Sequence, residues 1–183
     1  MNISITRIID VSVDILNKDG ISSLTMRKIA DRLQIAAASL YFHVKDKREI
    51  YGLIIEYICS AILNQITLQD TLEKICFIIR KEYKAVGDSP QLFAVSPPIT
   101  ESRIILINMI FDKLRELGVS DEHLAVSGNL LHNYILSFVT NEKIWENYTE
   151  EDSDIPFEVG ISDINKQFKF GLQVIFKGLE VLR

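Results

Sequence analysis

Apolar residues recur every three or four positions along nearly the whole chain, which is the spacing of one face of an α-helix. One short stretch that follows this spacing contains Met26, Ile29, Ala30 and Leu33. We find no convincing run of the kind that predicts a β-strand. The pattern therefore predicts an all-α protein built from several amphipathic helices.

Capping residues, glycines and prolines divide this pattern into separate helices, because they satisfy or interrupt the backbone hydrogen bonds at helix ends. The expected helices cover residues 5–19, 25–33, 36–43, 46–64, 70–86, 91–96, 100–117, 120–148 and 162–182. Residues 149–160 are acidic and contain Pro156, so we expect a mobile surface loop before the last helix.

The stretch from Leu24 to Arg48 predicts two short helices joined by a tight turn. Thr25 is expected to cap the first helix, and Gln34 and Ile35 form the break before the second. Asp46 is expected to cap the helix that follows. A short helix pair with a tight turn is the geometry that places its second helix in the major groove of DNA.

The same stretch resembles the DNA-binding domain of the tetracycline-repressor (TetR) family. The matching positions are Leu24, Thr25, Arg27–Ala30, Leu33, Ile35, Ser39–Tyr41, His43, Lys45 and Lys47. Gln34 stands where the family usually has a turn glycine, and Ala36–Ala38 stand where the recognition helix often begins with polar residues. Residues 131–142, 168–172 and 178–180 resemble the last helices of tetracycline-repressor-like C-terminal domains.

The resemblance implies a two-domain organisation and a function. Residues 1–48 would form a helix-turn-helix DNA-binding domain, helix 46–64 would link it to the rest, and residues 65–183 would form a ligand-binding and dimerisation domain. The implied protein is a transcriptional regulator, a repressor that a small-molecule ligand releases from a palindromic operator. The alanine-rich helix and Gln34 keep an alternative open, a helical dimerisation or adaptor protein that has lost sequence-specific DNA binding.

Charge is unevenly distributed along the chain, which carries a net charge of −5. Between Thr25 and Arg48 there are six positive and two negative residues, a net +4, which leaves −9 for the rest. A local positive potential is what contact with DNA phosphates requires. A charge run is otherwise usually a solvated helix face, and the helix-turn-helix pattern favours the phosphate interpretation.

The expected DNA-binding residues are Thr25, Arg27, Lys28, Ala37, Ala38, Ser39, Tyr41, His43 and Lys47. The resemblance places Arg27 near either a guanine edge or a phosphate, and Lys28 near a phosphate or solvent. Alanine methyl groups can touch a thymine methyl group, so operator half-sites rich in thymine are expected. The hydroxyl, imidazole and ammonium groups of the other residues are donors suited to phosphate, although His43 could instead be packed in an interface.

A set of aromatic residues in the second region could line a ligand cavity or form plain core: Phe77, Tyr83, Phe93, Phe111, Tyr134, Phe138 and Trp145. No metal site or cofactor is expected, because His123 and His132 are nine residues apart. Tetracycline repressors use a histidine near the end of the fourth helix for a magnesium–drug complex, where this chain has Leu63 and Asn64. Magnesium–tetracycline is therefore not the expected ligand.

The dimer interface is expected on the long helix 121–147 and on the last helix, 162–182. Three glycines inside these helices suggest close helix crossings, because each glycine costs a helix interior about 1 kcal/mol. An apolar stripe runs along the last helix. The expected interface residues are Gly128, Phe168, Gly171, Leu172, Ile175, Gly178 and Leu179. An intrachain core helix is the alternative for this stripe.

Other classes of protein are less well supported. The chain has no Ser/His/Asp set, glycine-rich phosphate loop, metal-ligand spacing or evident carboxylate pair, so we do not expect an enzyme. Its longest uncharged run, Leu124–Asn141, is interrupted by polar residues and does not resemble a membrane span of roughly 20 apolar residues. Charged residues near the N-terminus argue against a signal peptide. We expect a cytoplasmic protein in which Cys59 and Cys76 are buried, reduced thiols.

Overall fold

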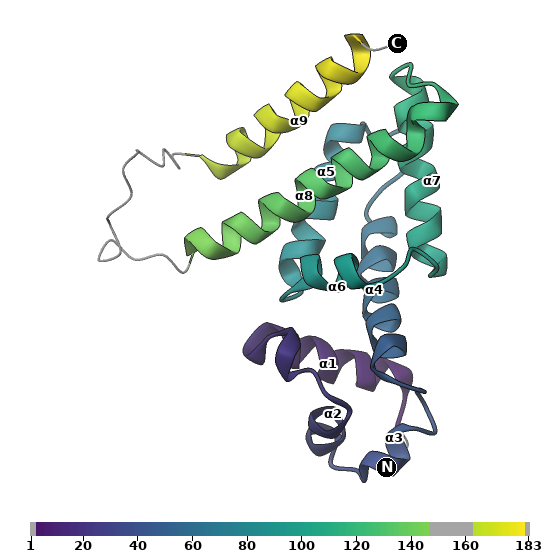
Figure 1. Cartoon of the computed structure of the whole chain (residues 1–183), viewed down its shortest axis with the longest axis vertical. Helices are drawn as coiled ribbons and strands as arrows, with labels where there is room; N and C mark the ends of the chain where they lie inside the picture. Colours follow the sequence, from purple (N-terminus) through teal and green to yellow (C-terminus); the bar gives the residue numbers. More distant parts are fainter. Residues whose placement is uncertain (1–2, 147–162, 182–183) are drawn as a thin grey trace, which may run out of the picture.

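The computed structural model describes residues 3–146 and 163–181, and within these ranges the chain is helical and contains no strand. This confirms the all-α prediction. Figure 1 shows a small group of N-terminal helices at one end, a larger helical body at the other, and α4 running between them. Among the described helices, none has the length and apolar character that crossing a membrane requires.

The small N-terminal unit, here called the head, contains α1 (Ile5–Asp19), the 3₁₀ turn η1 (Ile21–Ser23), α2 (Met26–Leu33) and α3 (Ala37–Leu40). Thr25 caps α2 as predicted, since its side chain accepts a hydrogen bond from the Lys28 N–H. The helix α3 is shorter than the predicted 36–43, because turns replace it after Leu40. The buried core of the head includes Ile8, Ile15, Leu16, Leu24, Ile29, Leu33, Leu40 and Val44.

The turn between α2 and α3 is made by a residue other than glycine. Gln34 has a left-handed backbone, with φ of 58°, and its N–H donates to the carbonyls of Ala30 and Asp31. Residues with a Cβ rarely adopt this conformation, which is why glycine is usual at such a helix end. The head thus has the turn that the TetR resemblance implies, although the left-handed backbone of Gln34 is strained.

The helix α4 (Lys47–Leu63) joins the head to the body. Asp46 caps it as predicted, by accepting hydrogen bonds from the N–H groups of Arg48 and Glu49. The Glu49 side chain in turn accepts from the Lys45 N–H. The helix packs against α1 near the head and against α5 and α7 in the body, so its orientation depends on both ends.

The body contains α5 (Leu72–Ala85), α6 (Ser89–Val95), α7 (Glu101–Glu116), the 3₁₀ turn η2 (Asp121–His123), α8 (Leu124–Glu146) and α9 (Ile164–Val181). The predicted start of α5 at Asp70 is corrected, because Thr71 caps the helix by accepting from the Lys74 N–H. The predicted end of α8 at residue 148 and the predicted loop 149–160 lie outside the described residues.

The head also touches the body through the segment between α5 and α6. Asp88 accepts a hydrogen bond from the Ile21 N–H at 2.8 Å and pairs with the Lys143 ammonium at 2.7 Å. At Gly87, an added Cβ would lie 2.5 Å from the Leu16 carbonyl oxygen. This close approach explains why a glycine stands there.

The structure corrects part of the predicted dimer interface. Phe168 and Leu172 have no exposed surface within the chain, because α9 packs them against α5 and α8. A Cβ added at Gly171 would collide with the Tyr134 side chain, and one added at Gly128 would meet Phe111. These glycines allow close packing within the chain. For Phe168 and Leu172, the alternative of an intrachain core helix is therefore the correct one.

The remaining predicted interface residues lie at the edge of that core. Ile175 and Leu179 are half-buried against it, and Gly178 faces open space. The two cysteines are buried as predicted, Cys59 in α4 and Cys76 in α5. Burial raises the pKa of the Cys59 thiol to about 12, so this thiol stays protonated and unreactive at neutral pH.

Candidate functional site

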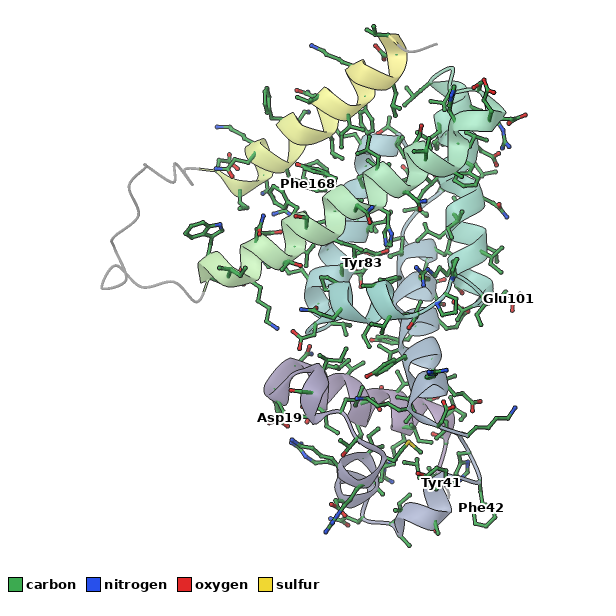
Figure 2. The ribbon with its side chains drawn as sticks, in the orientation of Figure 1. Asp19, Tyr41, Phe42, Tyr83, Glu101 and Phe168 are labelled. Carbon is green, nitrogen blue, oxygen red and sulfur yellow. The ribbon has the colours of Figure 1, made fainter. Side chains whose placement is uncertain are left out.

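The exposed end of the head carries most of the predicted DNA-binding residues. Ala37 and Ala38 are exposed on α3, Ser39 and His43 are partly exposed, and Thr25 is exposed at the start of α2. Tyr41 follows α3 with 54% of its surface exposed, and Figure 2 shows it far from the body. The structure thus brings these side chains to one end of the molecule.

Phe42, which sequence reasoning passed over, lies beside Tyr41 and is 88% exposed. A large apolar side chain that a domain leaves uncovered often marks a surface that contacts another molecule. The sequence signal was available, because the helical period that buries Leu40 and Val44 points Phe42 away from the core.

The positive charges of the head are not equally free. The Arg27 side chain is 90% exposed and lies 4.0 Å from Asp31. Lys28 and Arg32 instead form ion pairs with carboxylates of α1, Lys28 with Asp19 at 3.0 Å. Counting charges between residues 25 and 48 therefore overstates the local positive potential, because two of the six positive charges face acids outside that stretch.

The start of α4 holds the other predicted phosphate contact. The Lys47 ammonium lies over the Tyr51 ring, 5.3 Å from its centroid. The neighbouring residues Lys45 and Arg48 are exposed. A basic cluster of Lys45, Lys47 and Arg48 therefore lies at the start of α4, a few residues after α3 in the chain.

A second candidate site is a cavity of about 110 Å³ in the body, between α5, α7 and α8. Its walls are mostly apolar, and include Ile79, Leu106, Ile107, Ile110 and Ile135. The polar residues among its lining are Arg103, Asn129, His132 and Tyr83. An apolar cavity with a few converging polar groups is the usual form of a small-molecule site.

The predicted aromatic set divides between this cavity and the core. Tyr83 and Phe111 line the cavity, and Phe93 packs beside it against the Tyr83 ring at 4.4 Å. Phe77, Tyr134 and Phe138 lie elsewhere, packed around Phe168 with ring centroids 4.9 to 5.5 Å from it. These three are partly buried, pack against the core and do not line this cavity. Trp145 is partly buried near the end of α8, and it does not line the cavity.

His132 is a polar residue of the cavity wall that sequence reasoning considered only as a metal ligand. Its Nε2 lies 3.1 Å from the Tyr83 hydroxyl. Burial, aided by the nearby charge of Arg103, lowers the pKa of His132 to about 4. His132 is therefore neutral at physiological pH and serves as a hydrogen-bonding group.

Sequence reasoning also missed Arg103, which directly precedes the largely apolar run of α7 from Ile104 to Phe111. Its guanidinium lies 4.9 Å from the Phe93 ring centroid, and its Nη1 donates to the carbonyls of Ser96 and Pro97. Arg103 thus connects the cavity wall to the segment between α6 and α7.

The neighbour of Arg103 contacts α4 directly. Ser102 donates to the Glu56 carboxylate through its backbone N–H at 2.9 Å and through its hydroxyl at 2.5 Å. The basic cluster of the head lies at the other end of α4. This helix therefore connects the cavity wall to the head.

Two family models match the chain. The model described as bacterial regulatory proteins, tetR family, matches residues 8–54, and the model of the tetracycline repressor-like C-terminal domain matches residues 62–154, about half of the chain. The chain belongs to the TetR family. An HTH-type transcriptional regulator of Saccharopolyspora erythraea is 25% identical over 148 residues, which are 79% of this chain and 63% of that protein. The chain spans less than two thirds of the length of the curated relatives it matches.

Solved structures of the family share the whole fold. BioQ of Mycobacterium smegmatis superposes with a TM-score of 0.80 at 22% identity, covering 98% of this chain and 99% of BioQ. ActR of Streptomyces coelicolor in complex with (S)-DNPA also gives 0.80, at 20% identity, covering 99% of this chain and 98% of ActR. A BioQ structure with its double-stranded DNA operator gives 0.74 at 22% identity, covering 98% of this chain and 99% of BioQ. At these identities the likeness shows the fold.

Proposed function

We propose that this chain is a DNA-binding transcriptional regulator, a repressor that a small-molecule ligand releases from a palindromic operator. The observation that carries the proposal is the exposed surface of α3 and of Tyr41 after it, with Ala37 and Ala38 open to solvent and with Arg27 and Lys47 before and after this segment in the chain. BioQ, which has the same fold, has been solved with its DNA operator. Double-stranded DNA in the cytoplasm is accordingly the proposed partner, and no enzymatic activity is proposed.

The proposed roles of the head residues follow their exposure. Arg27 is free to reach a base edge or a phosphate, and Ala37 and Ala38 let α3 approach thymine methyl groups closely. Ser39, Tyr41, His43 and Lys47 would donate to phosphates. Thr25 already caps α2, and Lys28 would have to leave Asp19 to contact DNA.

A homodimer is the proposed assembly, because members of this family act as dimers. The exposed apolar residues of α8 and α9 support a face different from the one that the sequence suggested: Val126, Leu130, Phe170, Val174 and Val181. The two helices lie side by side in the body and pack against each other (Figure 1). A four-helix contact between two chains would bury this face.

The proposed ligand response runs from the cavity to the head through α4. A ligand in the cavity would act on Arg103, and its neighbour Ser102 holds Glu56 of α4. Only a ligand that binds one arrangement of α4 more tightly than another can shift the equilibrium between them. Two heads on a dimer would then no longer match successive major-groove faces.

The test is DNA binding by the full chain, measured by fluorescence anisotropy on operators selected from random sequence. Lys47→Ala should weaken binding to all sequences alike and reduce the salt slope by about one unit. Arg27→Ala should relax the preference at one base pair if it reads a base. Lys81→Ala, which removes the same charge from α5 in the body, is the control. A wild-type chain without salt-dependent DNA binding would favour the adaptor alternative.

A further inference from the structure

Arg103 is a buried cation without an acidic partner. Only 8% of its surface is exposed, and among the described residues no carboxylate lies within ion-pair distance of its guanidinium. Burying an arginine without an opposite charge is costly, and buried charges in proteins are normally paired. An anion bound beside this guanidinium would offset that cost, so an unpaired arginine in a cavity wall favours the binding of an anion there.

Arg80, elsewhere in the same body, shows how this chain pairs a buried arginine. Its Nε and Nη2 each donate to an oxygen of Glu142 at 2.7 Å, and its Nη1 donates to Asn165. Arg103 uses its Nη1 in a similar way, for the Ser96 and Pro97 carbonyls. Its Nε and Nη2, the edge that Arg80 offers to a carboxylate, have no acceptor among the described residues.

The rest of the cavity limits what such an anion can be. Arg103 is the one charged residue in the described lining, because His132 is neutral at physiological pH. One cation balances one negative charge, so a strongly hydrated polyanion would remain uncompensated. The walls beside it are aliphatic and aromatic, and Leu106, Ile110 and Phe111 are among them.

The size of the cavity sets the scale of the ligand. Its volume is about 110 Å³, and an engineered apolar cavity of roughly 150 Å³ binds benzene. The cavity is smaller than this reference, so the hydrocarbon part of the ligand is a short aliphatic chain, or at most a single ring that small shifts of the walls accommodate.

We propose that the cavity binds a small apolar carboxylate, whose two oxygens accept from Nε and Nη2 of Arg103 and whose hydrocarbon part packs against the walls. This inference rests on the proposed function, in which the cavity is the effector site. His132 and Asn129 supply further hydrogen-bonding groups in the lining. Arg103 then passes the binding event to the segment of Ser96 and Pro97, whose carbonyls it already holds.

The experiment compares carboxylates with their neutral amides on the full-length chain near neutral pH. The pairs are benzoate and benzamide, phenylacetate and phenylacetamide, and hexanoate and hexanamide. Thermal unfolding screens the pairs, and calorimetry measures their affinities. At least one carboxylate should bind about tenfold or more tightly than its amide, since hydrogen bonds to a charged group are the stronger kind. If no pair shows this preference, the proposal is wrong.

Variants of Arg103 then test the assignment. Arg103→Met should abolish the preference for the carboxylate. The matched control is Arg115→Met, in the last turn of the same helix, which should keep it. If Arg103→Met fails to fold, as judged by circular dichroism, Arg103→Lys decides, because it keeps the charge and loses the two-pronged geometry. A reduced preference in Arg103→Lys supports the proposal, and an unchanged preference in either folded variant overturns it.

DNA binding separates this inference from the proposed function. A carboxylate that binds through Arg103 and leaves the DNA affinity unchanged would support the ligand class and contradict the ligand-controlled repressor. Release of DNA by neutral ligands alone, with no preference for any carboxylate, would support the repressor and contradict the ligand class.

Discussion

The Glu56 carboxylate holds Ser102 by two hydrogen bonds, one from its backbone N–H and one from its hydroxyl, at 2.9 and 2.5 Å. Glu56 lies on α4, which begins at the head, and Ser102 is next to Arg103 in the cavity wall. This pair is the most direct polar link between the cavity and the helix that carries the basic cluster.

Removing this link should uncouple ligand and DNA. The Glu56→Ala variant should bind the preferred carboxylate with nearly wild-type affinity. In the wild type, the ligand should lower the DNA affinity by a factor of about 5 to 150, the usual range of allosteric coupling. In the variant, this factor should be several-fold smaller. Calorimetry gives the first quantity and anisotropy the second. The control is Glu82→Ala, because Glu82 accepts a comparable hydrogen bond from Gln65 away from α7. Unchanged coupling in Glu56→Ala would show that the signal takes another route.

Gln34→Gly should stabilise the head. The left-handed backbone of Gln34, with φ of 58°, costs a residue with a Cβ about 1 kcal/mol more than glycine, and the exposed side chain gives no packing in return. The free energy of unfolding should rise by up to about 1 kcal/mol, or a few degrees in Tm. Gln34→Ala, which keeps the Cβ, should show no gain. Equal stability of the two variants would mean that the turn is unstrained.

Arg80→Met should strongly destabilise the body. It would remove both short hydrogen bonds from the Glu142 carboxylate, which is 3% exposed, and leave it the half-exposed Lys84 as its ion-pair partner, at a cost of up to about 3–5 kcal/mol in chemical denaturation. Lys84→Met removes a more exposed partner of the same carboxylate and should cost less than about 1 kcal/mol. Similar losses of unfolding free energy in the two variants would contradict the role of Arg80 as the main partner of the Glu142 carboxylate.

The stability of the protein should depend on His132 in mild acid. Burial and the charge of Arg103 depress its pKa from 6.5 to about 4 in the folded state. Its stabilising contribution is present above pH 6.5 and is lost as the pH falls toward 4, because only the unfolded chain gains the proton there. The loss should reach about 3 kcal/mol. Denaturation curves of His132→Gln should lack this part of the slope, and an identical slope would refute the assignment.

The dimer test distinguishes two faces of α9. Phe170→Glu, at a position that is 68% exposed, should dissociate the dimer in sedimentation without unfolding the chain. Val95→Glu adds the same charge at another exposed apolar position and should leave the dimer intact. Gly171→Leu should instead unfold or loosen the packing of α9, because its side chain would collide with Tyr134. A folded, monomeric Gly171→Leu variant would restore the interface that the sequence suggested.

Local sequence determined the helices and the head. The spacing of apolar residues, the caps Thr25 and Asp46 and the break at Gln34 each act within a few residues of chain, so the backbone elements they specify were predicted closely. The buried cysteines and the all-α class followed from the same pattern. The domain boundary at residues 46–64 stays a prediction, although α4 spans it.

Tertiary packing decided which side chains face one another, and this is where the sequence was misleading. An apolar stripe such as that of Phe168 and Leu172 must be covered, but periodicity cannot say whether the cover comes from α8 of the same chain or from a second chain. For the same reason, periodicity could not show that Phe77 packs against Phe168 whereas Tyr83 lines the cavity. The fold also places Arg103 beside the cavity and away from every described carboxylate. The sequence could not predict this, because the electrostatic energy of a charged side chain depends on neighbours that are distant in sequence.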